Sequence, residues 1–136
     1  LFLSDTGDSQ VASAINFFNV NLTILKDEFA AIAPMQPAAF DRRVYEGSQV
    51  HSLDLIARDA QDHNGQFQKV SDADFVSNGG RASVFSSSRS ALHAHAGFNI
   101  DWGNDTPDGM QVGRGHRAGL MSSGTNVGIA MIETSM

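Results

Sequence analysis

The feature that most constrains this chain is residues 91–121, where a helical pattern runs into a glycine-rich loop that ends in a histidine. The stretch reads ALHAHAGFNIDWGNDTPDGMQVGRGHRAGLM and holds three of the five histidines and the only tryptophan. Residues 88–101 are predicted to form a helix, because Ser88 is a suitable N-cap and one face repeats at helical spacing. That face consists of Leu92, His95, Ala96, Asn99 and Trp102. Gly103 is expected to end the helix.

The segment after this helix is expected to present His116. Residues 103–115 carry several glycines and a proline, which is typical of a turning surface loop. His116 follows this loop directly, with Arg117 beside it and a short apolar helix after it. A histidine placed in this way is as good a candidate for a site as for packing.

Composition excludes several classes of partner. The chain has 136 residues, 41% of them hydrophobic, which predicts a single domain over residues 1–136 with its own core. Fifteen acidic against nine basic residues give a formal charge of -6, which argues against a nucleic-acid surface and against anionic membranes. No apolar run approaches the roughly 20 residues of a transmembrane helix. Because cysteine is absent, histidine and carboxylate are the only candidate metal ligands.

The N-terminal region predicts one long amphipathic helix over residues 11–29, capped at Asp8 or Ser9. Its apolar residues recur at spacings of three and four: Val11, Ile15, Phe18, Leu22, Leu25 and Phe29. We interpret it as a core helix, with a coiled-coil seam as the alternative. Asn21 and Asn104 each begin a glycosylation pattern, a signal that often arises by chance.

A second helix is predicted from Asp41, its N-cap, to about Ala60, after a proline-containing extended connector over residues 33–40. His51 lies among apolar neighbours on this helix and is expected to be a core or boundary residue. His63 lies past the helix end, next to the strong turn dipeptide Asn64-Gly65, and is therefore expected to be presented by a loop.

The remaining stretches predict few strands. Residues 66–80 are polar and are expected to be irregular, whereas residues 81–85 form a short candidate strand. Residues 126–133 read NVGIAMIE and are the best candidate strand in the chain. Helices that flank a few strands in one small domain favour an α/β layered sandwich.

Four blocks, in order, resemble the CAP superfamily of cysteine-rich secretory, antigen 5 and pathogenesis-related domains, in its cysteine-free bacterial form. They are QPAAFDRRVYEGSQVHSLDLIARD at 36–59, the turn DHNG, HAHAGFNIDWG at 93–103, and GRGHRAGLM at 113–121 leading into VGIAMI at 127–132. The resemblance implies a three-layer α-β-α sandwich, with a small central sheet flanked by helices and a central cleft. In that cleft, two histidines and two glutamates of the family can hold a divalent metal such as zinc.

Carried over residue by residue, the family's two histidines fall on His63 and His116. The glutamate of the family's Gly-Glu-Asn motif is replaced by Ala82, and the other glutamate has at best Asp105 at its spacing. Two imidazoles make a weak zinc site, so we expect no tightly bound metal. His63 and His116 are then a hydrogen-bonded cleft pair, with coordination of zinc or another divalent cation, or acid–base catalysis, as alternatives.

The surroundings of this pair are expected to include His95, Trp102, Asp105 and Arg117, and the charge of Arg117 lowers affinity for a cation further.

The resemblance thus implies a secreted, extracellular, non-enzymatic module that binds a lipid, a polysaccharide or a protein through a degenerate two-histidine cleft. A weakly metal-dependent hydrolase or protease-like enzyme that uses His63 and His116 is one alternative. A structural subunit of an extracellular assembly is another, because family domains continue to a further strand that this chain lacks or replaces. An uncovered edge at residues 126–133 would favour self-assembly, unless Leu1-Phe2-Leu3 supplies the missing strand.

Overall fold

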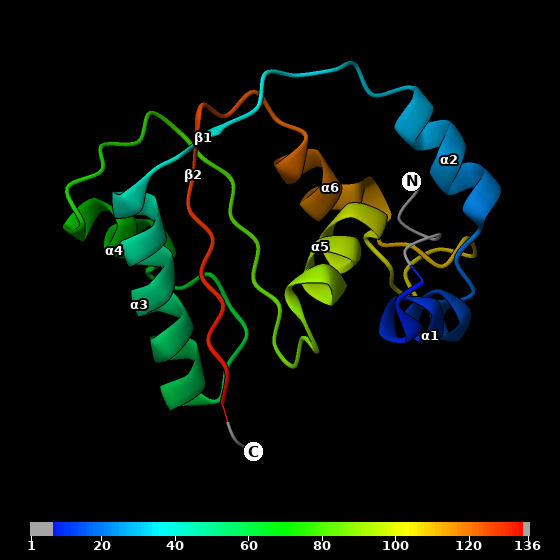
Figure 1. Ribbon diagram of the computed structural model, residues 1–136, viewed down its shortest axis with the longest axis horizontal. Helices are drawn as coiled ribbons and strands as arrows, with labels where there is room; N and C mark the ends of the chain where they lie inside the picture. The colour runs from blue at the N-terminus through cyan, green and yellow to red at the C-terminus, as the bar shows by residue number, and fades with distance from the viewer. Residues whose placement is uncertain (1–6, 135–136) are drawn as a thin grey trace. The chain divides into compact units, whose positions relative to one another are not determined.

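The computed structural model describes residues 7–134 and shows a mixed, mainly helical fold made of two compact units (Figure 1). Within the described residues, unit 1 comprises residues 7–35 and 87–122, and unit 2 comprises residues 36–86 and 123–134. Unit 1 contains α1 (Ser9–Phe18), α2 (Leu22–Ala30), α5 (Ala91–Ile100), the 3-10 helix η2 (Val112–Arg114) and α6 (Gly115–Leu120). Unit 2 contains β1 (Ala39–Phe40), α3 (Arg42–Arg58), α4 (Gln66–Asp72) and β2 (Asn126–Val127).

The α/β class is confirmed in this coarse form. The strands are short, and the three-layer sandwich with a central sheet stays a prediction. The single domain over residues 1–136 also stays a prediction, and Leu1-Phe2-Leu3 lie outside the described residues. No helix within residues 7–134 has both the length and the apolar character that crossing a bilayer requires.

The single helix predicted over residues 11–29 is wrong, because three residues divide it into α1 and α2. Asn19 adopts a left-handed conformation with φ 53° and ends α1. The next N–H, of Val20, donates to Ile15 O at 3.0 Å, which closes the last turn. Asn21 then starts α2, because its side chain accepts hydrogen bonds from the N–H groups of Thr23 and Ile24. The spacing of the apolar residues continues unchanged across this break and therefore does not predict it.

The start of α1 confirms the predicted cap. Asp8 Oδ1 accepts from the N–H groups of Gln10 at 2.9 Å and Val11 at 3.0 Å. The α1 helix packs on α5, and together with the loop that follows α5 these helices enclose the core of unit 1. Its buried apolar side chains are Val11, Ile15, Val20, Leu25, Ala96, Ile100, Trp102 and Met110.

The predicted helix over residues 88–101 exists as α5 with different ends. Ser90, and not Ser88, is the N-cap, since its Oγ accepts from the N–H of His93 at 3.0 Å. The helix ends before Gly103, because Asp101 adopts a left-handed conformation with φ 59° and its N–H donates to Gly97 O at 2.8 Å. This early ending places the Asp101 side chain at the centre of unit 1.

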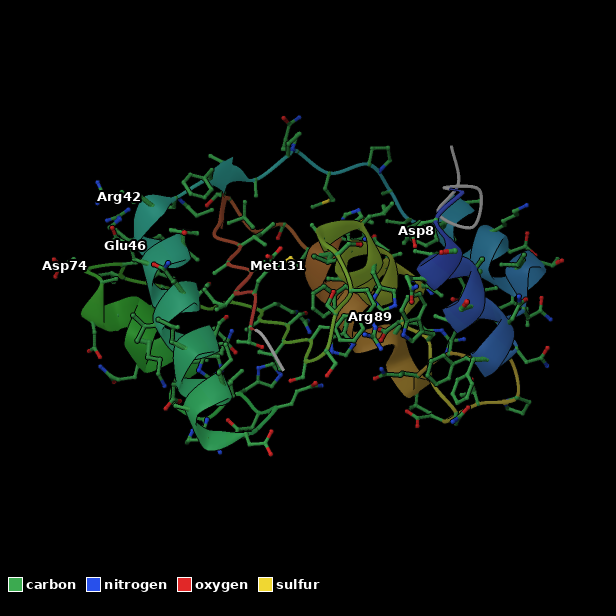
Figure 2. The ribbon with its side chains drawn as sticks, turned by 60° about the horizontal axis from the view of Figure 1, so that its bottom comes forward. Asp8, Arg42, Glu46, Asp74, Arg89 and Met131 are labelled. Atoms are coloured by element: carbon green, nitrogen blue, oxygen red, sulfur yellow. The ribbon has the colours of Figure 1, made fainter. Side chains whose placement is uncertain are left out.

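Unit 2 is organised by α3, whose predicted start and end are confirmed to within two residues. Asp41 caps it by accepting from the N–H of Arg43 at 3.0 Å. On its exposed side, Arg42 and Glu46 form an ion pair of 2.7 Å one turn apart (Figure 2). His51 lies on its buried side with 1% of its surface exposed, which confirms the expected core position.

Residues 66–80 are not wholly irregular as predicted, because α4 forms at their start and packs against α3. The contact is close: a Cβ at Gly47 of α3 would lie 2.6 Å from the Cα of Val70. This close approach buries Val70, and that burial stabilises α4 although the segment contains few apolar residues.

Strand content is smaller than predicted. Residues 81–85 form no strand, and in place of residues 126–133 only Asn126–Val127 pairs, in parallel, with Ala39–Phe40. The pairing stops on one side at Asp41, which caps α3. It stops on the other at Gly128, where a Cβ would lie 2.1 Å from the backbone nitrogen of Tyr45. The chain therefore passes against α3 instead of extending along β1, and self-assembly through residues 126–133 stays a prediction.

Candidate functional site

His116, in the first turn of α6, is held by the carboxylate of Asp101. Oδ1 of Asp101 lies 2.7 Å from Nδ1 of His116. The aspartate side chain is fully buried, whereas 29% of the His116 side chain is exposed. A carboxylate at Nδ1 holds the proton there and leaves the Nε2 lone pair directed away from it. The arrangement is therefore an oriented imidazole that carries an available acceptor atom.

The same carboxylate also caps the N-terminus of α6. This helix has no side-chain cap at its own N-cap residue, Arg114. Oδ2 of Asp101 accepts instead from the N–H of His116 at 2.9 Å and from the N–H of Arg117 at 3.3 Å. These two N–H groups belong to the first turn of α6, and N–H groups of a first turn have no acceptor within their own helix. Asp101 thus acts as the N-terminal cap of α6, although it precedes this helix by more than ten residues in the sequence.

The ring of His116 has a second neighbour, Phe98 of α5. The two ring centroids lie 5.5 Å apart with an angle of 32° between the planes. No residue in the described part of the chain is hydrogen-bonded to Nε2 of His116. The exposed part of the imidazole therefore offers one nitrogen acceptor beside an aromatic ring.

Arg117, adjacent to His116, serves the structure of unit 1. Its Nε donates to Asn99 O at 2.6 Å and its Nη2 donates to Ile100 O at 2.7 Å. Its Nη1 is hydrogen-bonded to Glu28 of α2, and its guanidinium lies 5.0 Å from the ring centroid of Phe29. Because only 3% of Arg117 is exposed, this residue ties α5, α6 and α2 together and does not point into solvent.

An ion-pair cluster that the sequence did not predict surrounds Arg117. Glu28 also accepts from Arg114, from Nε at 3.2 Å and from Nη2 at 3.1 Å, and Arg114 pairs with Asp108 at 2.7 Å. Burial raises the pKa of Glu28, but hydrogen bonds from both arginines outweigh it and leave the pKa below its ordinary value of 4.5. A hydrogen bond from Thr106, helped by Arg114, holds the pKa of Asp108 below 3.8.

His63 lies in unit 2, at the turn that precedes α4, where the sequence placed it. Its Nδ1 is 2.7 Å from Oε1 of Gln66, and its carbonyl accepts from the N–H of Gln66 at 3.1 Å. Ala82, at the position of the missing glutamate, is half-buried in the irregular segment that follows. Because His63 and His116 belong to different units, the shared two-histidine cleft stays a prediction.

The other residues expected around the pair have partners of their own. Nε2 of His95 lies 3.2 Å from Nδ2 of Asn99 on the same helix. Trp102 is buried and stacks on Phe18, with ring centroids 6.4 Å apart. Asp105 accepts from the N–H of Val112 at 3.4 Å. Of the four, only Arg117 shares a partner with His116, namely Asp101.

The donor atoms around His116 do not suit a divalent metal. Both oxygens of Asp101 accept hydrogens from His116 and Arg117, so they do not face a cation. Among residues 7–134, no group of three or more histidine, aspartate or glutamate side chains is placed to hold a metal ion. A zinc site usually takes at least three protein ligands, and the described residues do not fit one.

No protein-family model, curated protein or solved structure matches the chain. The likeness to the CAP superfamily therefore rests on the four sequence blocks. The chemistry available at the site is that of one oriented imidazole: its Nε2 can accept a hydrogen bond, bind a cation weakly or accept a proton.

Proposed function

We propose that the chain is a secreted, non-enzymatic ligand-binding module of the kind its CAP-like blocks imply, with His116 as the central contact of its binding site. The observation that carries this proposal is the pair formed by buried Asp101 and partly exposed His116. An imidazole fixed in one orientation loses little freedom when a ligand binds, which favours affinity.

The chemistry of the site favours a ligand with hydroxyl donors. Nε2 of His116 is a hydrogen-bond acceptor, and the ring of Phe98 beside it offers an apolar face. A polysaccharide presents both hydroxyl groups and C–H faces, so among lipids, polysaccharides and proteins it is the class that we propose first. An anionic ligand is less suited, because Asp101 puts a negative charge behind the ring.

The test is a titration of the labelled protein with neutral soluble polysaccharides, lipid vesicles and peptides, followed by the ring nitrogen signals of His116 in NMR spectra. We expect a neutral polysaccharide to shift the Nε2 signal saturably and His116→Ala to weaken binding about tenfold, the effect of losing about 1.4 kcal/mol. His95→Ala removes an imidazole from the same unit and serves as the matched control. Binding that is equally strong in His116→Ala would refute the proposal.

A second function, hydrolysis that depends on acid–base chemistry or a weakly held metal, is suggested by the same pair, because Asp101 fixes the orientation of His116 and leaves its Nε2 available. Zinc titration by calorimetry distinguishes it from binding alone. A heat that disappears in both His63→Ala and His116→Ala would support the enzyme. Absent heat, or heat unchanged by the two substitutions, removes it.

A further inference from the structure

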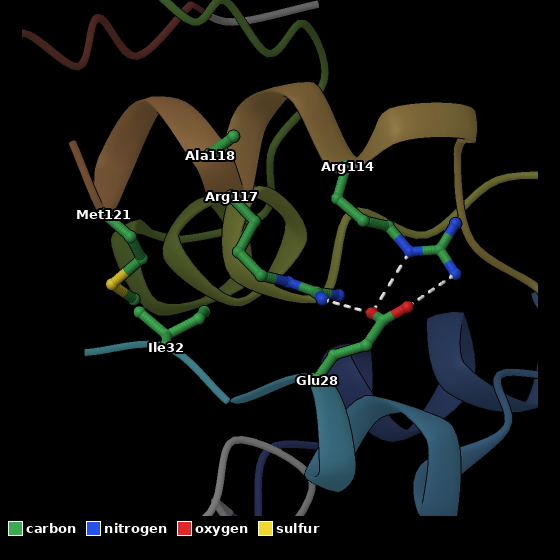
Figure 3. A pocket seen from close by; sticks show the side chains of 6 residues that line it. All are labelled: Glu28, Ile32, Arg114, Arg117, Ala118 and Met121. Carbon is green, nitrogen blue, oxygen red and sulfur yellow. Dashed lines mark hydrogen bonds and ion pairs between the residues drawn. The ribbon is translucent and has the colours of Figure 1, made fainter. Parts of the chain in front are cut away.

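Unit 1 contains a pocket of about 400 Å³ that does not involve His116. It is lined by Glu28 and Ile32 on one side and by Arg114, Arg117, Ala118 and Met121 on the other (Figure 3). Figure 3 shows the three charged side chains meeting at one end, whereas Ile32 and Met121 lie together at the other. Its volume falls at the small end of the range of about 300–1,000 Å³ that is typical of ligand pockets.

The charged end of the pocket is electrically balanced. Arg114 and Arg117 are matched by Glu28 and by Asp108, which pairs with Arg114 from behind. The donors of both arginines are directed at these carboxylates and at backbone carbonyls, including Gln111 O at 2.5 Å from Arg114 Nη1. Neither guanidinium therefore offers an unused charge to a ligand.

The accessible polar group is the carboxylate of Glu28. Its side chain is 34% exposed, compared with 17% for Arg114 and 4% for Arg117. Oε1 of Glu28 receives a hydrogen bond from Nη2 of Arg114 only. A carboxylate oxygen has two lone pairs, so Oε1 can accept one more hydrogen bond. The pocket thus presents an acceptor at one end and aliphatic side chains at the other.

We propose that this pocket binds a small, uncharged amphiphile, whose hydroxyl or amide head donates a hydrogen bond to Glu28 and whose short aliphatic part lies between Ile32, Ala118 and Met121. Because the charges of this cluster balance, an ion of either sign would lose its hydration on entering the pocket and find no unpaired countercharge there. A neutral donor avoids this cost and satisfies the free acceptor. This site goes beyond the function proposed above, because it uses neither His116 nor Asp101.

The test compares four ligands of equal chain length: 1-hexanol, hexanamide, hexanoate and hexylammonium. The methyl group of Met121 reports binding in NMR spectra of protein labelled at methionine methyls, and Met131 of unit 2, which does not line the pocket, is the internal reference. We expect saturable shifts of Met121 with hexanol and hexanamide, and binding about fivefold weaker or worse for the two ions. Hexanoate binding as tightly as hexanol, or no saturable shift with either neutral ligand, overturns the proposal.

Two substitutions on α6 locate the site. Ala118→Phe puts a ring at a residue that lines the pocket and keeps every residue of the ion-pair cluster, and we expect it to abolish the Met121 response. Leu120→Phe adds a ring to the same helix at a residue that does not line the pocket, and it should leave hexanol binding unchanged. Circular dichroism checks that both variants fold. Hexanol binding that survives Ala118→Phe refutes this site, whereas loss of polysaccharide binding in His116→Ala bears only on the other one.

Discussion

Asp101 combines roles that are usually divided among several residues. Its backbone ends α5 in a left-handed conformation, one of its oxygens accepts from the first turn of α6, and the other orients His116. Because this carboxylate is fully buried, every hydrogen-bond donor that faces it depends on it. The geometry of the proposed binding site and the packing of two helices therefore rest on one side chain.

Asp101→Asn tests this dependence while keeping the backbone, since asparagine also tolerates the left-handed conformation. Its amide nitrogen donates and cannot accept, so either a backbone N–H of the first turn of α6 loses its partner or the imidazole is forced into the tautomer that has its proton on Nε2. We expect a loss of about 1–3 kcal/mol in the free energy of unfolding, measured with urea. The ring nitrogens of His116 should also lose their single tautomer in NMR spectra. His116→Ala, which keeps the carboxylate and both backbone donors, should cost less; equal stability of Asp101→Asn and the wild type would contradict this role.

The division between α1 and α2 depends on Asn19, which holds a positive φ. Alanine keeps a Cβ in that conformation but lacks the short polar side chain with which asparagine tolerates it, and we expect a loss of about 1 kcal/mol in stability. Asn19→Gly is the matched control, because glycine adopts positive φ readily, and it should stay close to the wild type. Urea unfolding measures both. If Asn19→Ala were as stable as Asn19→Gly, the break between the helices would not depend on this residue.

The contact between α3 and α4 depends on the absence of a side chain at Gly47. Alanine would gain about 1 kcal/mol in helix propensity. Its Cβ would lie 2.6 Å from the backbone of Val70, and overpacking of this kind costs about 1–3 kcal/mol. We therefore expect Gly47→Ala to lower the unfolding free energy and Gly47→Val to lower it further. Gly115→Ala, where no atom from outside its own turn of helix lies within 4 Å of the added Cβ, should cost nothing. A stabilised Gly47→Ala would refute the close approach.

Local signals predicted the elements whose causes are local. The α3 helix was found from its Asp41 cap and its periodicity, and His116 was correctly placed after a turning loop. By contrast, the α1–α2 break depends on the capping geometry of Asn19 and Asn21, which a regular apolar spacing conceals. The three apolar positions before that break, Val11, Ile15 and Phe18, and the three after it, Leu22, Leu25 and Phe29, keep the spacing of one helix. Periodicity without cap analysis therefore joins the two helices.

Elements that depend on distant contacts were missed. The α4 helix is stabilised by its approach to Gly47, and β2 is shortened where Gly128 meets α3; neither contact has a signal in the neighbouring sequence. The same holds for the site. Asp101 lies 15 residues before His116, and Glu28 lies 86 residues before Arg114. The sequence pattern therefore indicated His116, but neither Asp101, which holds its ring, nor Glu28, which pairs with Arg114 and Arg117.

At the scale of the whole molecule, both units carry carboxylates whose pKa values are lowered by partners. In unit 2, a hydrogen bond from the Arg43 side chain lowers the pKa of Asp41 to about 2. In unit 1, the pKa values of Glu28 and Asp108 lie below their ordinary values, as described above. Each such group stabilises the folded state above its ordinary pKa, because the unfolded chain binds a proton there more readily.

We therefore expect stability to be constant near neutral pH and to fall as the pH decreases below about 4.5, the ordinary value for glutamate, towards 2. Urea unfolding at pH 7, 5 and 3 measures this loss. Glu28→Gln removes one of the titrating groups, so its stability should depend less on pH over that window. Stability that rises on acidification would show that these carboxylates are not held in their charged form.

The two units are interleaved along the sequence, and this order bears on how a nascent chain acquires its structure. Residues 7–35 cannot complete the packing of unit 1 until residues 87–122 have been synthesised. Similarly, β1 has no partner strand until Asn126 and Val127 have left the ribosome. Synthesis of the 85 residues between Phe40 and Asn126 takes on the order of ten seconds. Until those later residues emerge, the apolar faces of the early helices lack their native covering, and the nascent chain exposes hydrophobic surface that the folded protein buries.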